Sequence, residues 1–112
     1  MLLQGYIDRD YREIIQLEYI PVGETTYKIV DANTVTKVEF RIGDFCVSTE
    51  DHPEIIALET SATRVGINLG KIPDIQVGRY QFYLTVFDAI QADGVPWGSG
   101  IAVIREWPKC DT

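Results

Sequence analysis

The single histidine, His52, is the residue of this chain best suited to acid–base chemistry near neutral pH. It lies in the segment Glu50-Asp51-His52-Pro53, and a catalytic dyad or triad would need it beside a nucleophile such as Ser48, Ser61 or Cys46. Nothing in the sequence positions any of these nucleophiles against the histidine. The sequence therefore predicts no catalytic residue, and we expect the protein not to be an enzyme.

Metal chemistry has equally little support in the sequence. One histidine and two distant cysteines, Cys46 and Cys110, do not make a zinc ligand set. Acidic side chains gather at Asp8 with Asp10, at Glu50 and Asp51 with Glu54, and at Asp88 with Asp93, but none of these groups has the ligand order of a calcium loop. We expect solvated loops there, with no metal and no cofactor, and expect Asp88 to tie down the loop that follows it through backbone N–H groups.

Aromatic residues outside the expected core are more informative. The interface candidates are Tyr6, Tyr11, Tyr83, Phe87, Trp97 and Trp107. Aromatic side chains are enriched at protein interfaces, and planar rings also stack on sugars. The competing interpretation is that the terminal segments fold over these rings and bury them, with Trp97 closing one end of the domain. Taken as a set, the six residues predict an interface.

Residues 1–12 carry Tyr6, Ile7 and Tyr11 between alternating charges and show no continuous periodicity. We interpret the segment as an amino-terminal arm. It could order on a neighbouring subunit by strand addition, or it could be a frayed terminus, and the sequence leaves both open.

The stretch 78–88 is the strand around which we expect the domain to fold. Tyr80, Phe82, Leu84 and Val86 alternate with Arg79, Gln81, Tyr83, Thr85 and Phe87, which is typical of a strand with one face in a core. The Gly-x-Tyr at its start resembles the tyrosine corner of immunoglobulin-like sandwiches, in which the hydroxyl bonds to the backbone just upstream.

Further strands are predicted at 13–20, 25–30, 35–42, 45–48, 64–69 and 101–106. Residues 54–60 are ambiguous between strand and helical turn, 71–75 form a crossing between sheets that can include one helical turn, and 89–100 read as a long loop. The last strand should lie antiparallel to the central one.

Regularly spaced short strands indicate an all-β fold, an immunoglobulin-like two-sheet antiparallel β-sandwich of about seven strands with a terminal arm. The expected divisions are the arm at 1–12, the sandwich at 13–107 and a tail at 108–112. The expected core comprises Phe40, Ile42, Ile67, Leu69, Tyr80, Phe82, Leu84 and Val103.

Charge narrows the choice of partners. The 112 residues include 10 Lys and Arg against 17 Asp and Glu, for a formal net charge of -7. An acidic surface repels phosphate backbones and anionic lipids, so we expect neither nucleic acid nor membrane as a partner. The amino terminus lacks the features of a signal peptide, which favours free cysteines, although pairing of Cys46 with Cys110 stays open.

Four segments together suggest a family. They are Val38-Glu-Phe-Arg-Ile42, Arg64-Val-x-Ile-x-Leu69, Gly78-x-Tyr-x-Phe-x-Leu-x-Val86 and Gly100-Ile-x-Val-Ile104. In this order they resemble the small immunoglobulin-like domains of tailed-bacteriophage virion proteins, notably the amino-terminal domain of baseplate upper proteins. The chain departs from that family by ending soon after the domain, and the resemblance carries no catalytic residue over.

The resemblance implies a non-enzymatic virion structural protein, either a tail or baseplate component or a capsid decoration. Its partners would be other virion proteins or further copies of itself in a homo-oligomer, and it would be made in the host cytoplasm and located in the virion. The alternative is a carbohydrate-binding or host-surface adhesion module whose platform would use Tyr83, Trp97 and Trp107.

Overall fold

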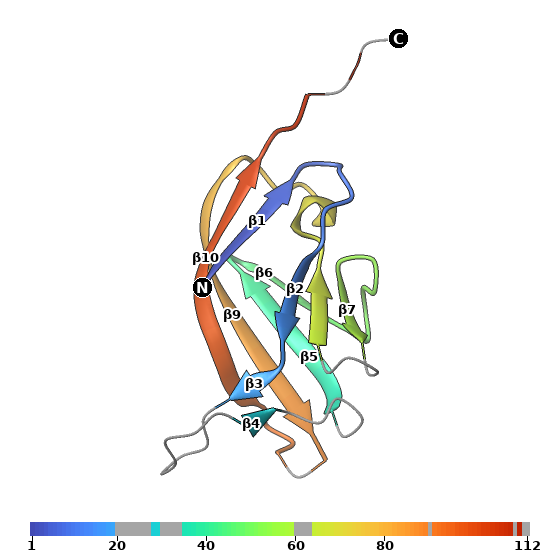
Figure 1. Cartoon of the computed structure of the whole chain (residues 1–112), viewed down its shortest axis with the longest axis vertical. Coiled ribbons are helices and arrows are strands. Elements are labelled where there is room, and N and C mark those ends of the chain that lie inside the picture. Colours follow the sequence, from blue (N-terminus) through green and yellow to red (C-terminus); the bar gives the residue numbers. More distant parts are fainter. Residues whose placement is uncertain (20–27, 30–34, 60–63, 90, 109, 111–112) are drawn as a thin grey trace.

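Segments in which apolar and polar residues alternate form most of the strands in the computed structural model (Figure 1). The structure describes residues 1–19, 28–29, 35–59, 64–89, 91–108 and 110. The strands are β1 (Leu2–Tyr6), β2 (Glu13–Gln16), β3 (Glu18–Tyr19), β4 (Lys28–Ile29), β5 (Val35–Ile42), β6 (Phe45–Ser48), β7 (Ile56–Glu59), β8 (Arg64–Ile67), β9 (Gly78–Asp88) and β10 (Val95–Arg105). A 3-10 helix, η2 (Leu69–Lys71), connects β8 to the segment before β9. Over the described ranges, no helix is long and apolar enough to cross a membrane.

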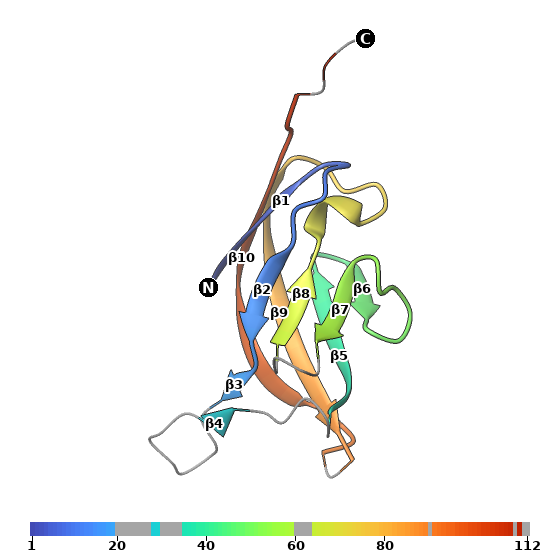
Figure 2. The same ribbon diagram turned by 45° about the vertical axis from the view of Figure 1, so that its right-hand side comes forward.

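The strands form two packed layers, so the protein is an all-β sandwich, as predicted. The larger sheet has the order β1-β10-β9-β5-β6 and the smaller sheet has the order β2-β8-β7. Figure 2 shows the smaller sheet in front of β9 and β5. A short ladder of β3 with β4 extends from the end of β2.

The strand order is that of an immunoglobulin-like sandwich. In the usual lettering β2, β7 and β8 correspond to strands B, D and E, and β5, β6, β9 and β10 to strands C, C′, F and G. These seven strands pair only in antiparallel fashion. With β1, β3 and β4 the described residues form ten strands, more than the about seven expected from the sequence.

Two stacked phenylalanines lie at the centre of the core. Phe40 of β5 and Phe82 of β9 are fully buried, with ring centroids 5.5 Å apart. Both residues belong to the predicted core, as do the buried residues Ile42, Ile67, Leu69 and Leu84. Complete burial of an aliphatic or aromatic side chain of this size stabilises a fold by about 1.5–3 kcal/mol.

The predicted tyrosine corner is present at the start of β9. Tyr80 donates a hydrogen bond of 2.7 Å from its hydroxyl to the backbone oxygen of Gln76, four residues upstream. Tyr80 also belongs to the predicted core, but it is only half-buried and packs against the buried core residues. In antibody domains the residue two positions after this tyrosine is a core cysteine, and here Phe82 takes that place.

The amino-terminal segment differs from the expected arm. Residues 2–6 form β1, which pairs in parallel with β10 over five residues and buries Leu3. The backbone N–H of Asp8 then bonds to the oxygen of Gly70, which fixes the end of the strand. The segment adds a strand to its own sheet, so the larger sheet is mixed and not purely antiparallel. Only Leu3 and Gly5 of this strand point inward, and two inward residues are too few to identify a strand from the sequence.

The last strand also differs from its prediction. β10 begins at Val95, so the second half of the expected loop at 89–100 belongs to the sheet, with a bulge between Pro96 and Gly98. Antiparallel pairing of β10 with β9 is confirmed. The predicted burial of Val103 is wrong, because Ala102 and Ile104 face the core instead. Both alternating sets of residues in this strand are apolar, so the sequence pattern did not distinguish the two faces.

The remaining predictions concern shorter elements. The ambiguous stretch 54–60 contains strand β7, and the helical turn expected at 71–75 occurs slightly earlier, as η2. The strand predicted at 13–20 is divided into β2 and β3, and most of the strand predicted at 25–30 lies outside the described residues, with β4 as its described part.

Candidate functional site

The smaller sheet covers one face of the larger sheet, and no described element covers the other face. Because side chains alternate along each strand, every second residue of β1, β10, β9 and β5 points to this uncovered side. We call these residues the outer sheet face. It comprises Leu2, Gln4 and Tyr6 of β1, Ser99, Ile101, Val103 and Arg105 of β10, Arg79, Gln81, Tyr83, Thr85 and Phe87 of β9, and Lys37, Glu39 and Arg41 of β5.

The centre of the outer sheet face is apolar. Leu2 is 57% exposed and is the cross-strand partner of Ile101, which in turn faces Gln81. Val103 lies two residues further along β10, and Tyr83 of β9 is 48% exposed. Isolated exposed apolar residues are ordinary on a protein surface, whereas large exposed apolar patches occur at interaction sites, so the outer sheet face is the candidate site.

Arginines border this apolar centre. Arg41 is the cross-strand partner of Tyr83, Arg79 is the partner of Val103, and Arg105 is the partner of Tyr6. With Lys37, the face carries four cations against one carboxylate, Glu39. The whole chain has a formal net charge of -7, so the charge of this face opposes that of the molecule.

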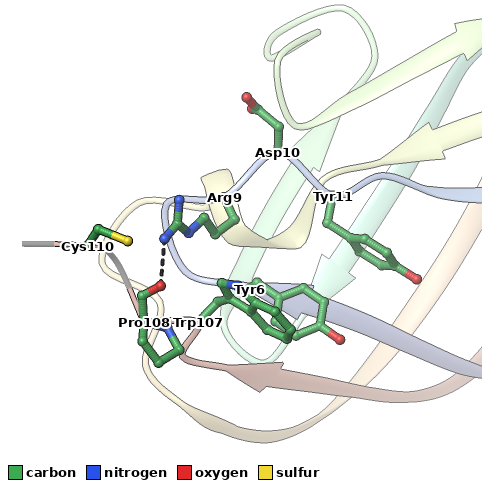
Figure 3. A pocket seen from close by; sticks show the side chains of 7 residues that line it. All are labelled: Tyr6, Arg9, Asp10, Tyr11, Trp107, Pro108 and Cys110. Carbon is green, nitrogen blue, oxygen red and sulfur yellow. Dashed lines mark hydrogen bonds between the residues drawn. The ribbon is translucent and has the colours of Figure 1, made fainter.

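Three of the six predicted aromatic candidates meet at one end of this face. The ring of Tyr6 packs edge-on against Tyr11, with centroids 5.2 Å apart, and against Trp107 at 5.5 Å. Figure 3 shows these rings together, with Arg9 and Pro108 to their left. We call Tyr6, Tyr11 and Trp107 the terminal aromatic cluster. It lines an open groove of about 930 Å³ that also contacts Arg9, Asp10, Pro108 and Cys110.

Polar contacts hold the terminal aromatic cluster in place. Arg9 donates a hydrogen bond of 2.8 Å from Nη2 to the backbone oxygen of Pro108, which links the two ends of the described chain (Figure 3). A hydrogen bond between Tyr11 and the Glu13 carboxylate raises the pKa of the Tyr11 phenol. Trp107 nevertheless remains 59% exposed and Tyr11 41% exposed, so the described terminal segments leave these two rings accessible, whereas Tyr6 is half-buried.

The other three candidates have separate environments. Tyr83 lies in the middle of the outer sheet face, and Phe87 lies near its end beneath the ammonium of Lys37, 4.5 Å from the ring centroid. Trp97 sits at the bulge of β10 and packs against the core, so for this residue the competing interpretation, burial within the domain, is correct. Tyr83, Trp97 and Trp107 therefore form no shared platform for a sugar.

Among the described residues, the polar candidates do not assemble into a reactive site, and the candidate nucleophile Ser61 lies outside the described residues. His52 is exposed, and its Nδ1 lies 2.9 Å from Oε1 of Glu54. The backbone N–H of Glu54 and the His52 ring both bond to this carboxylate, and they lower the pKa of Glu54. The hydroxyl of Ser48 donates a hydrogen bond to the Asp51 carboxylate and not to the His52 ring. Within the described part of the chain, no group of three or more His, Cys, Asp or Glu residues could hold a metal ion.

Other polar predictions have clear outcomes. Asp88 accepts a hydrogen bond of 2.6 Å from the backbone N–H of Gln91, so it ties down the following loop as expected. Cys46 and Cys110 are both free and exposed. The sequence analysis missed Leu2, Ile101 and Val103 as surface residues. Strand alternation did predict outward positions for Arg41 and Arg79, but these arginines were not counted among the interface candidates.

Comparison with known families, with characterised proteins and with solved structures found no match to this chain.

Proposed function

We propose that this protein is a non-enzymatic structural subunit of a tailed-bacteriophage virion, in the tail, in the baseplate or on the capsid, and that it works through protein–protein contacts. The virion setting rests on the resemblance of four strand segments to virion immunoglobulin-like domains. The observation that carries the contact function is the outer sheet face, whose apolar centre is uncovered and bordered by arginines.

The composition of the outer sheet face supports a protein partner. Interface cores are enriched in aromatic residues and Arg and are depleted in Lys and Glu. Tyr83 pairs across the strands with Arg41, and tyrosine and arginine are among the residues that most often dominate the binding energy of an interface. The terminal aromatic cluster continues this surface at the end of β1, because Tyr6 belongs to both.

Incorporation into virus particles tests the proposal. Wild-type chain and a Tyr83→Ser variant would be supplied separately to assembling particles, and the particles would be examined by mass spectrometry and cryo-electron microscopy. We expect wild type at regular, symmetry-related positions and at least tenfold less of the variant, because Tyr83 lies at the centre of the contact.

Ile14→Ser is the matched control. Ile14 is 46% exposed, close to the 48% of Tyr83, but it lies on β2, on the outside of the smaller sheet. We expect it to enter particles like wild type. Particles without the wild-type chain would contradict the virion setting, and equal incorporation of Tyr83→Ser would contradict the assigned surface.

A further inference from the structure

We propose that the outer sheet face docks onto the acidic loop between β6 and β7 of a second copy, in a head-to-tail arrangement. This inference rests on the proposed function and names the partner of the same surface. The acidic loop is the segment 49–55, which carries Glu50, Asp51 and Glu54 and contains no Lys or Arg.

The cations of the outer sheet face are available for a partner. Over the described ranges, Arg79 and Arg105 make no ion pair, and Arg41 bonds only to the backbone oxygen of Gly43, at 3.3 Å. Lys37 is the exception, since it lies 3.7 Å from Glu39 and over Phe87. Arginine suits such a surface because its planar guanidinium binds carboxylates through two parallel hydrogen bonds.

Charge excludes the simplest self-association, in which two outer sheet faces meet. A two-fold contact uses the same patch on both subunits, so the arginines of one copy would face those of the other. Like charges brought together in this way cost several kcal/mol. Charge therefore favours an acidic occupant of the face, and this chain presents an acidic surface elsewhere.

The acidic loop is held in a fixed conformation. Backbone N–H groups of Asp51 and His52 bond to the oxygen of Ser48, and those of Ile55 and Ile56 bond to the oxygen of His52. The side chain of Ile55 is 1% exposed and anchors the loop in the core. Glu50 and Glu54 are thus exposed on a rigid support, and a rigid surface loses little conformational entropy when it binds.

The apolar centre of the outer sheet face and the acidic loop lie toward opposite edges of the larger sheet, although the face also includes β5, which pairs with β6. The apolar centre of the outer sheet face belongs to β1, β10 and β9, whereas β6 forms the opposite edge of the same sheet and leads into the acidic loop (Figure 1). Contact between two different patches is heterologous, and repeated use of it produces a closed ring or an open filament. Both are common forms of assembly for a structural subunit.

Sedimentation velocity of the purified chain tests the inference, under reducing conditions because Cys46 and Cys110 are exposed. We expect concentration-dependent association that weakens at high salt, since salt screens exposed charges. Two double variants are tested, Arg41→Glu/Arg79→Glu and Glu50→Lys/Glu54→Lys. Each should associate at least about tenfold more weakly than wild type, because each places like charges at the contact. Circular dichroism and thermal unfolding would show that both variants fold.

The decisive experiment mixes the two variants in equal amounts. In a head-to-tail contact, every interface of the mixture can pair opposite charges again, so association should return. A face-to-face contact would behave differently, because Glu50→Lys/Glu54→Lys alone would associate like wild type. That result would overturn the inference, as would a mixture that stays dissociated.

Further outcomes separate this inference from the proposed function. A wild-type chain that remains monomeric at all concentrations would overturn self-docking. If Tyr83→Ser still failed to enter particles, the outer sheet face would keep its role with a different acidic protein as its partner. A third outcome would be that duplex DNA retains the wild type at low salt, that Arg41→Glu/Arg79→Glu loses this retention, and that the wild type does not self-associate. This outcome would assign the face to a polyanion, and it would overturn both the self-docking inference and the proposed function.

Discussion

Strand β9 has two faces with opposite roles, although they are built from alternate residues of a single stretch of chain. Phe82, Leu84 and Val86 are at most 3% exposed and pack toward the smaller sheet. Tyr83, between the first two, is 48% exposed and faces solvent. Neighbouring aromatic residues therefore serve different purposes: Phe82 holds the two sheets together, and Tyr83 is available for a partner.

The largest expected effect is the difference in unfolding free energy between truncating Phe82 and truncating Tyr83. Phe82→Ala removes a buried ring that stacks on Phe40, and should lower the free energy of unfolding by about 3–5 kcal/mol. Tyr83→Ala should change it by only about 0.5 kcal/mol, as is usual for surface positions. Chemical denaturation followed by circular dichroism measures both values. Similar losses for the two variants would break the distinction between the faces.

The sequence predicted the strands with one polar face most accurately. The predicted bounds of β5, β6 and β9 agree with the structure, because charged or polar residues alternate there with buried apolar ones. In β10 the pattern failed, since Ile101 and Val103 alternate with Ala102 and Ile104 and either set could have been buried. Period-two patterning identifies a strand, but only a polar face tells which side meets the core.

The candidate site was predictable only in part. Aromatic composition identified Tyr6, Tyr11 and Trp107, but their meeting depends on the parallel pairing of β1 with β10, which no local pattern encodes. Pairing between segments about a hundred residues apart in the chain follows from the whole fold. The sequence left two interpretations of Trp97 open for a related reason, because no local pattern shows that its side chain, at the bulge between Pro96 and Gly98, packs against the core.

A smaller effect tests whether β1 belongs to the sheet as firmly as β9 does. A Cβ atom at Gly70 would overlap the backbone oxygen of Tyr6. Gly70→Ala should therefore displace β1 and cost about 1–3 kcal/mol of unfolding free energy, the usual range for overpacking. Hydrogen exchange should also speed up at the β1 amides.

Gly98→Ala is the control for this substitution, because a Cβ there would meet no atom within 4 Å. We expect Gly98→Ala to leave stability and β1 exchange close to wild type. If Gly70→Ala behaved in the same way, β1 would be a loosely attached arm, as the sequence first indicated, and the outer sheet face would lose the fixed positions of Leu2 and Tyr6.

The smallest expected effect compares the hydroxyl groups of two tyrosines of β9, that of Tyr80, which is hydrogen-bonded, and that of Tyr83, which belongs to an exposed ring. Tyr80→Phe removes the hydroxyl that bonds to the Gln76 backbone oxygen at 2.7 Å, and should cost about 0.5–1.5 kcal/mol, the net contribution of one such bond. Tyr83→Phe removes a hydroxyl from an exposed ring and should be neutral within about 0.5 kcal/mol. Urea denaturation resolves this difference. Equal stabilities for the two variants would mean that the hydrogen bond of the tyrosine corner contributes nothing to the free energy of unfolding. The backbone alone would then fix the conformation of the chain before β9.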